Sequence, residues 1–258
     1  MVLCELEASG SFFTTWLSLT LMGLLSQFVF SGGAFYYYYV DPTYEKWVWK
    51  SNPEYPKPEK VREEILQMIK GLCSATLCPA FSLYLARHGQ SYGYCGLGGF
   101  SVGYLALTFL VTWVVSDFYE FFYHHLGHRY AACWENHRHH HVFFNPSPFS
   151  VIADEYIDQF ARSTPLVVLP LLVPINQDML FLQYAFFFYG FCVKCWDQLF
   201  GTMHPDGVAK SAMCAQQRGE RSREVWEKTV VPDYSVLLSP SFWSPANFRE
   251  LKQAAKSA

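Results

Sequence analysis

The sequence predicts an all-α fold: a polytopic membrane bundle of about four apolar segments, the last a hairpin, with a histidine-rich helical cap. Hydrophobic residues make up 51% of the 258 residues and charged residues only 16%, whereas soluble domains carry about 25% charged residues. Several apolar runs approach the length of a membrane span. Seven of the nine histidines lie between His124 and His141.

The same composition excludes several classes of protein. A chain so rich in apolar residues is neither disordered, collagen-like nor a coiled coil. A net charge of −3 argues against a nucleic-acid partner. The eight cysteines show no spacing typical of a disulfide framework. Cys192-Val-Lys-Cys195 lacks the second ligand pair of a zinc site, so we interpret it as incidental.

The first apolar run extends from Phe12 to Phe30 without a charge. At 1.5 Å per residue, its 19 residues span about 28 Å, close to the roughly 30 Å hydrocarbon core. Acidic residues precede it and no small-residue cleavage site is evident, so a retained anchor is favoured over a signal peptide. Residues 1–34 are therefore expected to form an N-terminal transmembrane anchor that ends at Gly32 and Gly33, before an interfacial belt of aromatic residues.

Residues 35–116 are expected to contain a loop and two further spans. The loop, 41–64, is polar and carries four prolines. An apolar run at 65–85, interrupted by Pro79, predicts the second span, and a run at 100–122 predicts the third.

A fourth apolar region, 165–191, carries Pro170, Pro174, Asn176 and Asp178. This pattern favours two short half-spans in a hairpin over one straight span. The last segment, 206–258, is expected to be a polar tail.

The distribution of Lys and Arg predicts the orientation. None precedes the first run and none lies in 88–99, whereas five lie in 41–64 and nine follow residue 193. Cytoplasmic loops carry an excess of these residues. We therefore expect the N-terminus and the 88–99 turn to face away from the cytosol, and the histidine segment and the C-terminus to be cytosolic, in the endoplasmic reticulum membrane.

The histidines are spaced as helical pairs. His124 and His128 are four residues apart and share one helical face. His137 pairs with His140 at three residues and with His141 at four. Imidazole is the commonest protein ligand for Fe, Cu, Zn and Ni. These five residues are the predicted metal ligands, and they exceed the needs of one tetrahedral ion, which predicts two metals near a membrane interface.

Other residues are expected to support these ligands. The predicted supporting residues are Asp117, two turns before His124 on the same face, His125, His139 and Glu155. Carboxylates can balance the charge of a metal held by neutral imidazoles, and those nearby are Asp117, Glu120, Asp154, Glu155 and Asp158. Two alternatives are a polar or pH-sensing patch and a histidine tract that binds zinc opportunistically, but the paired spacings beside an apolar run favour an ordered metal site.

The motifs resemble those of the fatty acid hydroxylase/sterol desaturase superfamily of integral-membrane enzymes. His124-His-Leu-Gly-His128 is similar to its first histidine box and His137-Arg-His-His-His141 to its second. Asn145-Pro-Ser-Pro-Phe149 and the segment from Trp196 to Pro205 resemble flanking family motifs. The resemblance covers residues 117–205, which it identifies as a fatty acid hydroxylase-like domain.

The resemblance implies a membrane-bound oxidoreductase of lipid biosynthesis, including sterol biosynthesis. Such enzymes use O2 to hydroxylate or desaturate C–H bonds of sterols or fatty acyl chains at a di-iron site. They receive electrons from a donor such as cytochrome b5. Zinc in place of iron stays open, because sites made only of histidine do not select iron by softness alone.

The sequence departs from the family at one place. Family members carry a third box, H-x-x-H-H, before the motif that begins here at Trp196. In this chain the residues from Tyr189 to Cys195 run directly into that motif, so the domain is internally truncated near 190–196. The alternative hypothesis is therefore a catalytically inactive relative that acts as a lipid-binding or interaction protein in the membrane.

Overall fold

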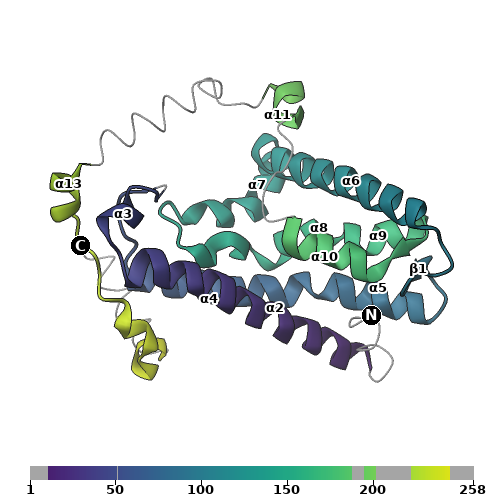
Figure 1. Cartoon of the computed structure of the whole chain (residues 1–258), viewed down its shortest axis with the longest axis horizontal. Helices are drawn as coiled ribbons and strands as arrows, with labels where there is room; N and C mark the ends of the chain where they lie inside the picture. The colour runs from purple at the N-terminus through teal and green to yellow at the C-terminus, as the bar shows by residue number, and fades with distance from the viewer. Residues whose placement is uncertain (1–10, 51, 188–194, 202–221, 245–258) are drawn as a thin grey trace. The chain divides into compact units, whose positions relative to one another are not determined.

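The computed structural model of the protein describes residues 11–50, 52–187, 195–201 and 222–244. Helices dominate these residues (Figure 1). The strands within them are β1 (Gly93–Tyr94) and β2 (Ile175–Asn176), a short parallel pair with Gly93 opposite Ile175. The predicted all-α class is confirmed.

The helices follow one another in this order. The N-terminal part contains α2 (Phe12–Phe35), the π-helical turn η1 (Tyr36–Val40), α3 (Tyr44–Trp47), α4 (Pro58–Ala75) and α5 (Leu77–Arg87). The middle contains α6 (Val102–Arg129), α7 (Ala131–His137), the 3-10 turns η2 (Arg138–Val142) and η3 (Pro148–Ile152), α8 (Tyr156–Ser163), α9 (Pro165–Leu172) and α10 (Gln177–Phe187). The last elements are α11 (Cys195–Phe200), α13 (Arg223–Glu227), η5 (Tyr234–Leu238) and η6 (Pro240–Trp243).

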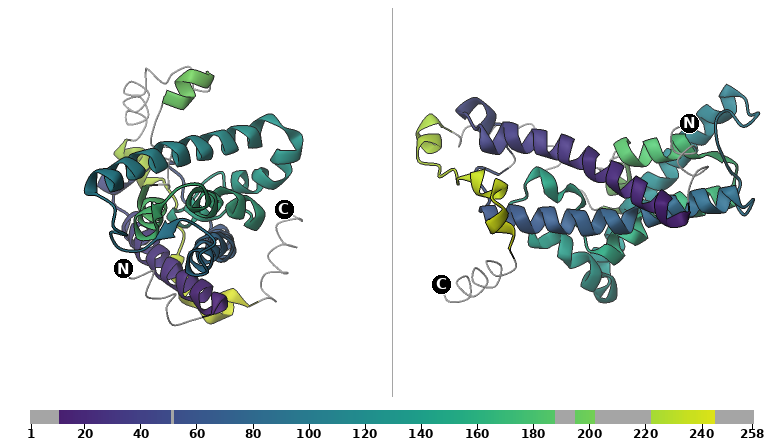
Figure 2. Two further views of the ribbon diagram at one scale, coloured as in Figure 1. Left: turned by 90° about the vertical axis from the view of Figure 1, so that its right-hand side faces the viewer. Right: turned by 90° about the horizontal axis from the view of Figure 1, so that it is seen from below.

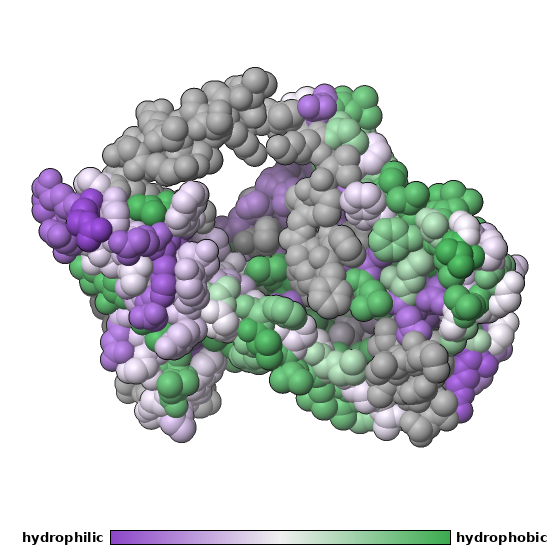
Figure 3. All heavy atoms as spheres, in the orientation of Figure 1, coloured by the Kyte–Doolittle hydropathy of each residue, from purple (hydrophilic) through white to green (hydrophobic). Residues whose placement is uncertain are grey.

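Three helical segments are long and apolar enough to cross a membrane: Phe12–Val40, Pro58–Arg87 and Val102–Arg129. They correspond to the first three predicted spans. Many of their large apolar side chains are exposed, and apolar side chains cover much of the surface in Figure 3. Such surface is costly in water but favourable in lipid.

The helix of the first predicted span does not end at Gly32 and Gly33, where the sequence predicted the span to end. Both glycines lie inside α2, and the turn η1 extends the helix to Val40. Glycine ends a helix readily only where the backbone adopts positive φ, and neither glycine does so. By contrast, Pro79 falls in the first turn of α5, after a break at Thr76. A proline is tolerated there because the first amides of a helix have no partner within it.

The chain forms two compact units. The first contains residues 1–26, 67–142 and 151–204, and the second contains 27–66, 143–150 and 205–258. In the first unit, α6 packs against α8 and α10 (Figures 1 and 2). Its apolar core joins α5, α9 and α10 to the start of α2, with Leu83, Ile175 and Leu180 fully buried.

The buried face of α6 is polar over much of its length. Thr108, Thr112, Ser116 and Glu120 recur at every fourth position, and all four are buried. The hydroxyl of Thr112 donates to the Gln183 side chain across 2.7 Å. In a membrane such an arrangement places polar groups inside the bundle and apolar side chains toward lipid.

The fourth apolar region folds as two short helices, as predicted for a hairpin. α9 and α10 are separated by an extended stretch that contains β2. The hydroxyl of Tyr104 at the start of α6 donates to the Pro174 carbonyl across 2.8 Å. Asn176 donates to the Gly96 carbonyl. The connection between α9 and α10 is therefore held against the turn that precedes α6.

In the second unit, the buried Glu64 carboxylate accepts hydrogen bonds from the amide and hydroxyl of Ser147. The C-terminal segment was expected to be a polar tail, but part of it is packed. Tyr234 is buried, and its hydroxyl donates to the Pro56 carbonyl across 2.6 Å. Arg62 donates to the Phe242 carbonyl. The rest of the tail, 206–221 and 245–258, lies outside the described residues.

Candidate metal centre

The end of α6 and the segment after it bring the histidines together. His124 and His128 lie in the last two turns of α6. Tyr130 is extended, with φ −121° and ψ 129°, so the chain turns and α7 packs against the end of α6 (Figure 1). His137 ends α7, and His141 follows in η2. Helical spacing predicts each of the two histidine pairs. The backbone turn at Tyr130, which spacing does not indicate, brings the two pairs together.

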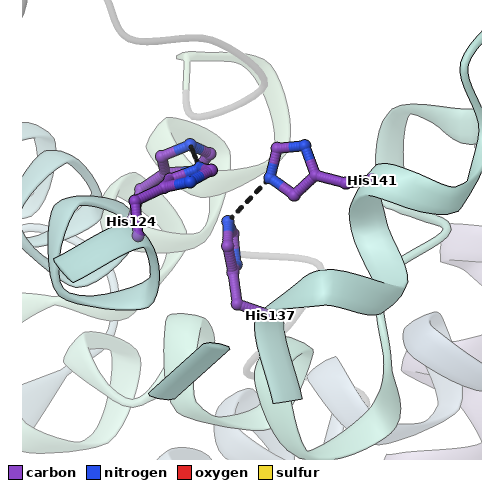
Figure 4. Close-up of side chains that lie close together, drawn as sticks. His124, His137 and His141 are labelled. Atoms are coloured by element: carbon purple, nitrogen blue, oxygen red, sulfur yellow. Dashed lines mark hydrogen bonds between the residues drawn. The ribbon is translucent and has the colours of Figure 1, made fainter. Parts of the chain in front are cut away.

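Four imidazoles converge on one point: those of His124, His128, His137 and His141. One ring nitrogen from each lies within 4.8 Å of all the others. The Nε2 atoms of His124 and His128 are 3.0 Å apart, and those of His137 and His141 are 3.2 Å apart. Figure 4 shows the rings of His124, His137 and His141 directed toward one another.

These four nitrogens fit one metal ion. Tetrahedral zinc has Zn–N distances of about 2.0–2.1 Å, which place ligand nitrogens about 3.3 Å from one another. The observed Nε2 pairs at 3.0 Å and 3.2 Å are close to that spacing. Imidazole also suits iron, copper and nickel, so the donor set does not by itself choose the metal. The arrangement can hold one such ion through small side-chain adjustments.

The other predicted site residues that the structure describes do not join these four. His140 was predicted as the fifth ligand, and its side chain lies outside the described part. The His125 ring stacks on Phe121 with centroids 6.0 Å apart, and His139 is exposed. Asp117 accepts a hydrogen bond from the Trp196 indole across 2.8 Å.

Glu155 caps the start of α8 and accepts from the Ile157 amide across 2.8 Å. The metal roles predicted for His125, His139, Asp117, Glu155 and His140 stay predictions.

Two neighbours of the cluster were not singled out from the sequence. The Trp134 ring lies 5.5 Å from the rings of both His128 and His141, between centroids. Its position three residues before His137 is the only signal that could have indicated it. Tyr123 donates its hydroxyl to Asp158 across 2.7 Å, and no local spacing connects these two residues.

An ion-pair network lies beside the cluster in the same unit. Arg162 in α8 donates to Glu120 of α6 across 2.8 Å and also to Asp154. Glu120 and Asp154 are buried. Although burial lowers the pKa of the Arg162 guanidinium, Glu120 and Asp154 raise it above its ordinary value. The arginine therefore stays charged and holds α8 against α6.

Gly127 allows His137 to approach α6. A Cβ atom at position 127 would lie 2.7 Å from Cγ and 3.1 Å from Cβ of His137, closer than two carbons approach without repulsion. The atoms that clash are near the backbone of a buried residue, so they cannot rotate away. The small residue between the two histidines of the first box is therefore a packing requirement of the cluster.

We predict that Gly127→Ala displaces the His137 ring, weakens metal binding about 10-fold or more, and destabilises the protein by about 1–3 kcal/mol through overpacking. Co²⁺ titration and thermal unfolding of the purified protein measure both effects. Gly103→Ala in the same helix is the matched control, because its added methyl has no neighbour closer than 3.8 Å. Equal Co²⁺ affinities in the two variants would contradict the packing argument.

No protein-family model and no solved structure matches the sequence. A Delta(7)-sterol 5(6)-desaturase of Schizosaccharomyces pombe is 25% identical over 179 residues, which cover 69% of this chain and 51% of that protein. A Delta(7)-sterol 5(6)-desaturase of Gibberella zeae is 27% identical over 108 residues, 42% of this chain and 32% of that protein.

The chain thus spans about half the length of the first of these relatives and less of the second. Both relatives are named sterol desaturases, and such enzymes belong to the fatty acid hydroxylase/sterol desaturase superfamily. The chain is therefore similar, at low identity, to oxidoreductases of sterol metabolism.

Proposed function

We propose that this protein is a membrane-bound, metal-dependent oxidoreductase of lipid biosynthesis, a member of the fatty acid hydroxylase/sterol desaturase superfamily. Its substrate would be a sterol or a fatty acyl lipid, and its reaction an O2-dependent hydroxylation or desaturation. The observation that carries the proposal is the four-imidazole cluster at the end of α6, a helix apolar enough to cross a membrane. Similarity to two sterol desaturases supports it.

Iron is the metal that this function requires, and His124, His128, His137 and His141 would hold it. Bound iron would supply the activation of O2 needed to attack an unactivated C–H bond. The residues of the chain hold the imidazoles in place, and buried carboxylates such as Asp158 balance the charge of the site. A second iron, expected from the family, needs further ligands, for which His140 is the candidate in the second box.

The proposal includes an orientation. The histidine segment and the C-terminus would face the cytosol, where a donor such as cytochrome b5 delivers electrons, and the membrane would be that of the endoplasmic reticulum. The turn at 88–99 would then face the lumen. Cys95 in this turn is disulfide-bonded, although no disulfide framework was expected from the sequence.

A second candidate function is that of an inactive relative that binds lipid or another membrane protein. The sequence observation that favours it is the absence of the third histidine box before Trp196. The junction itself, 188–194, lies outside the described residues. Without the third box, the second metal would bind weakly or not at all.

The two candidates differ in product formation. We expect expression of the chain in a strain that lacks its own sterol desaturase, followed by mass spectrometry of sterols and fatty acids, to show a new hydroxylated or desaturated lipid. A variant with His124→Ala and His128→Ala is the control for activity that needs the cluster. Wild-type lipid profiles identical to those of this control, with the protein present in membranes, would favour the inactive relative.

A further inference from the structure

His137 is the most constrained ligand of the cluster. Its side chain is only 3% exposed, and Gly127 lies against its ring atoms. Its Nε2 atom faces Nε2 of His141 at 3.2 Å, so Nε2 is the nitrogen directed into the cluster. An imidazole that binds a metal through Nε2 must carry its proton on Nδ1.

The Nδ1 atom of His137 faces a carboxylate. Oδ2 of Asp158 lies 3.4 Å from Nδ1, and the Asp158 side chain is only 1% exposed. The separation is a few tenths of an ångström beyond a hydrogen bond, which a small rotation of either side chain closes. Burial of both groups favours that closure, because a buried carboxylate is stabilised by each hydrogen bond that it accepts.

Asp158 is itself held in position. Its Oδ1 accepts the Tyr123 hydroxyl of α6 across 2.7 Å, so the carboxylate presents its other oxygen to His137. One turn further along α8, Arg162 is paired with Glu120 and Asp154, and this network fixes the helix that carries Asp158. Two helices thus orient one side chain toward Nδ1.

From this geometry we propose that Asp158, held by Tyr123, is a positioning residue that fixes the His137 imidazole with Nδ1 protonated and Nε2 directed to the metal. The inference rests on the metal centre of the proposed function and goes beyond it, because it assigns the residue that sets one ligand's ring orientation and tautomer. Mutation of a carboxylate that accepts the second N–H of a metal-binding histidine typically weakens metal binding 10–100-fold.

The test is a Co²⁺ titration of the full-length protein, purified in detergent and stripped of metal. The visible absorption of bound Co²⁺ reports both affinity and coordination geometry. We expect Asp158→Asn to weaken Co²⁺ binding about 10–100-fold and to change the absorption spectrum at saturation. Tyr123→Phe, which leaves the carboxylate but frees it to rotate, is expected to weaken binding several-fold.

Glu135→Gln is the control: it also converts a carboxylate to an amide near His137, but Glu135 is exposed and pairs with Arg138. Its affinity and spectrum should match those of the wild type. Wild-type affinity and spectrum in Asp158→Asn would overturn the inference while leaving the metal centre intact. If Asp158→Asn does not fold, the Co²⁺ affinity of Tyr123→Phe is the test. A wild-type affinity in that variant also overturns the inference. A wild-type protein that binds no Co²⁺ overturns the metal centre and the inference together.

Discussion

Replacing His137 with alanine is expected to abolish ordered metal binding. The residue supplies one of four nitrogens that converge within 4.8 Å, and it is the buried member of the cluster. Losing a direct ligand should exceed the 10–100-fold effect of losing an outer partner, so Co²⁺ affinity should fall by more than about 100-fold. Metal content by mass spectrometry and any lipid product should fall with it.

His88→Ala is the matched control for this variant. His88 is exposed, and its ring contacts the Tyr84 carbonyl across 2.8 Å rather than the cluster. The His88→Ala substitution removes an imidazole from the chain but leaves the four histidines of the cluster unchanged. The metal content of this variant should therefore equal that of the wild type. Equal losses in both variants would indicate nonspecific binding of metal by histidines and would refute the ordered site.

Arg162→Met is expected to give the largest loss of stability. The substitution leaves the buried carboxylates of Glu120 and Asp154 without their shared cation, and breaking such a pair costs about 3–5 kcal/mol. For a chain of this size, that corresponds to a fall of roughly 6–20 °C in apparent melting temperature. Thermal unfolding in detergent, followed by tryptophan fluorescence, measures it.

Two comparisons separate charge from packing in this network. A triple variant with Arg162→Met, Glu120→Gln and Asp154→Asn removes all three charges and should recover most of the lost stability. Arg138→Leu breaks only the exposed pair with Glu135, and such pairs contribute about 0–1 kcal/mol. If Arg162→Met melts like Arg138→Leu, the network does not hold α8 against α6.

The three apolar spans of the bundle and the two histidine pairs of the cluster could be predicted from the sequence. Apolar length is a local property, so the three spans could be found from it. A spacing of four residues on a helix predicts that His124 lies beside His128, and the same spacing predicts that His137 lies beside His141. Joining the two pairs depends on the extended backbone at Tyr130, where no glycine or proline indicates a turn.

Other features could not be predicted because they depend on contacts between distant segments. Asp158 lies 21 residues after His137 in the sequence, and the packing of α8 against α6 and α7 brings the two together. From the sequence, Glu155 was predicted as a supporting residue, whereas Asp158 was only one of several nearby carboxylates. Glu155 lies at the start of α8, where its carboxylate caps the helix. Asp158 lies three residues further along.

The polar face of α6 has a consequence for how the protein is made. An aspartate such as Asp117 costs about 3 kcal/mol at the centre of a lone helix in a bilayer, and the hydroxyl of Thr112 donates to Gln183 of α10. Since α10 lies some 50 residues after α6 in the chain, Thr112 gains this hydrogen bond only after the later hairpin has formed. The polar face of α6 is therefore completed late, and a chain that stops before α10 would lack the hydrogen bond between Thr112 and Gln183.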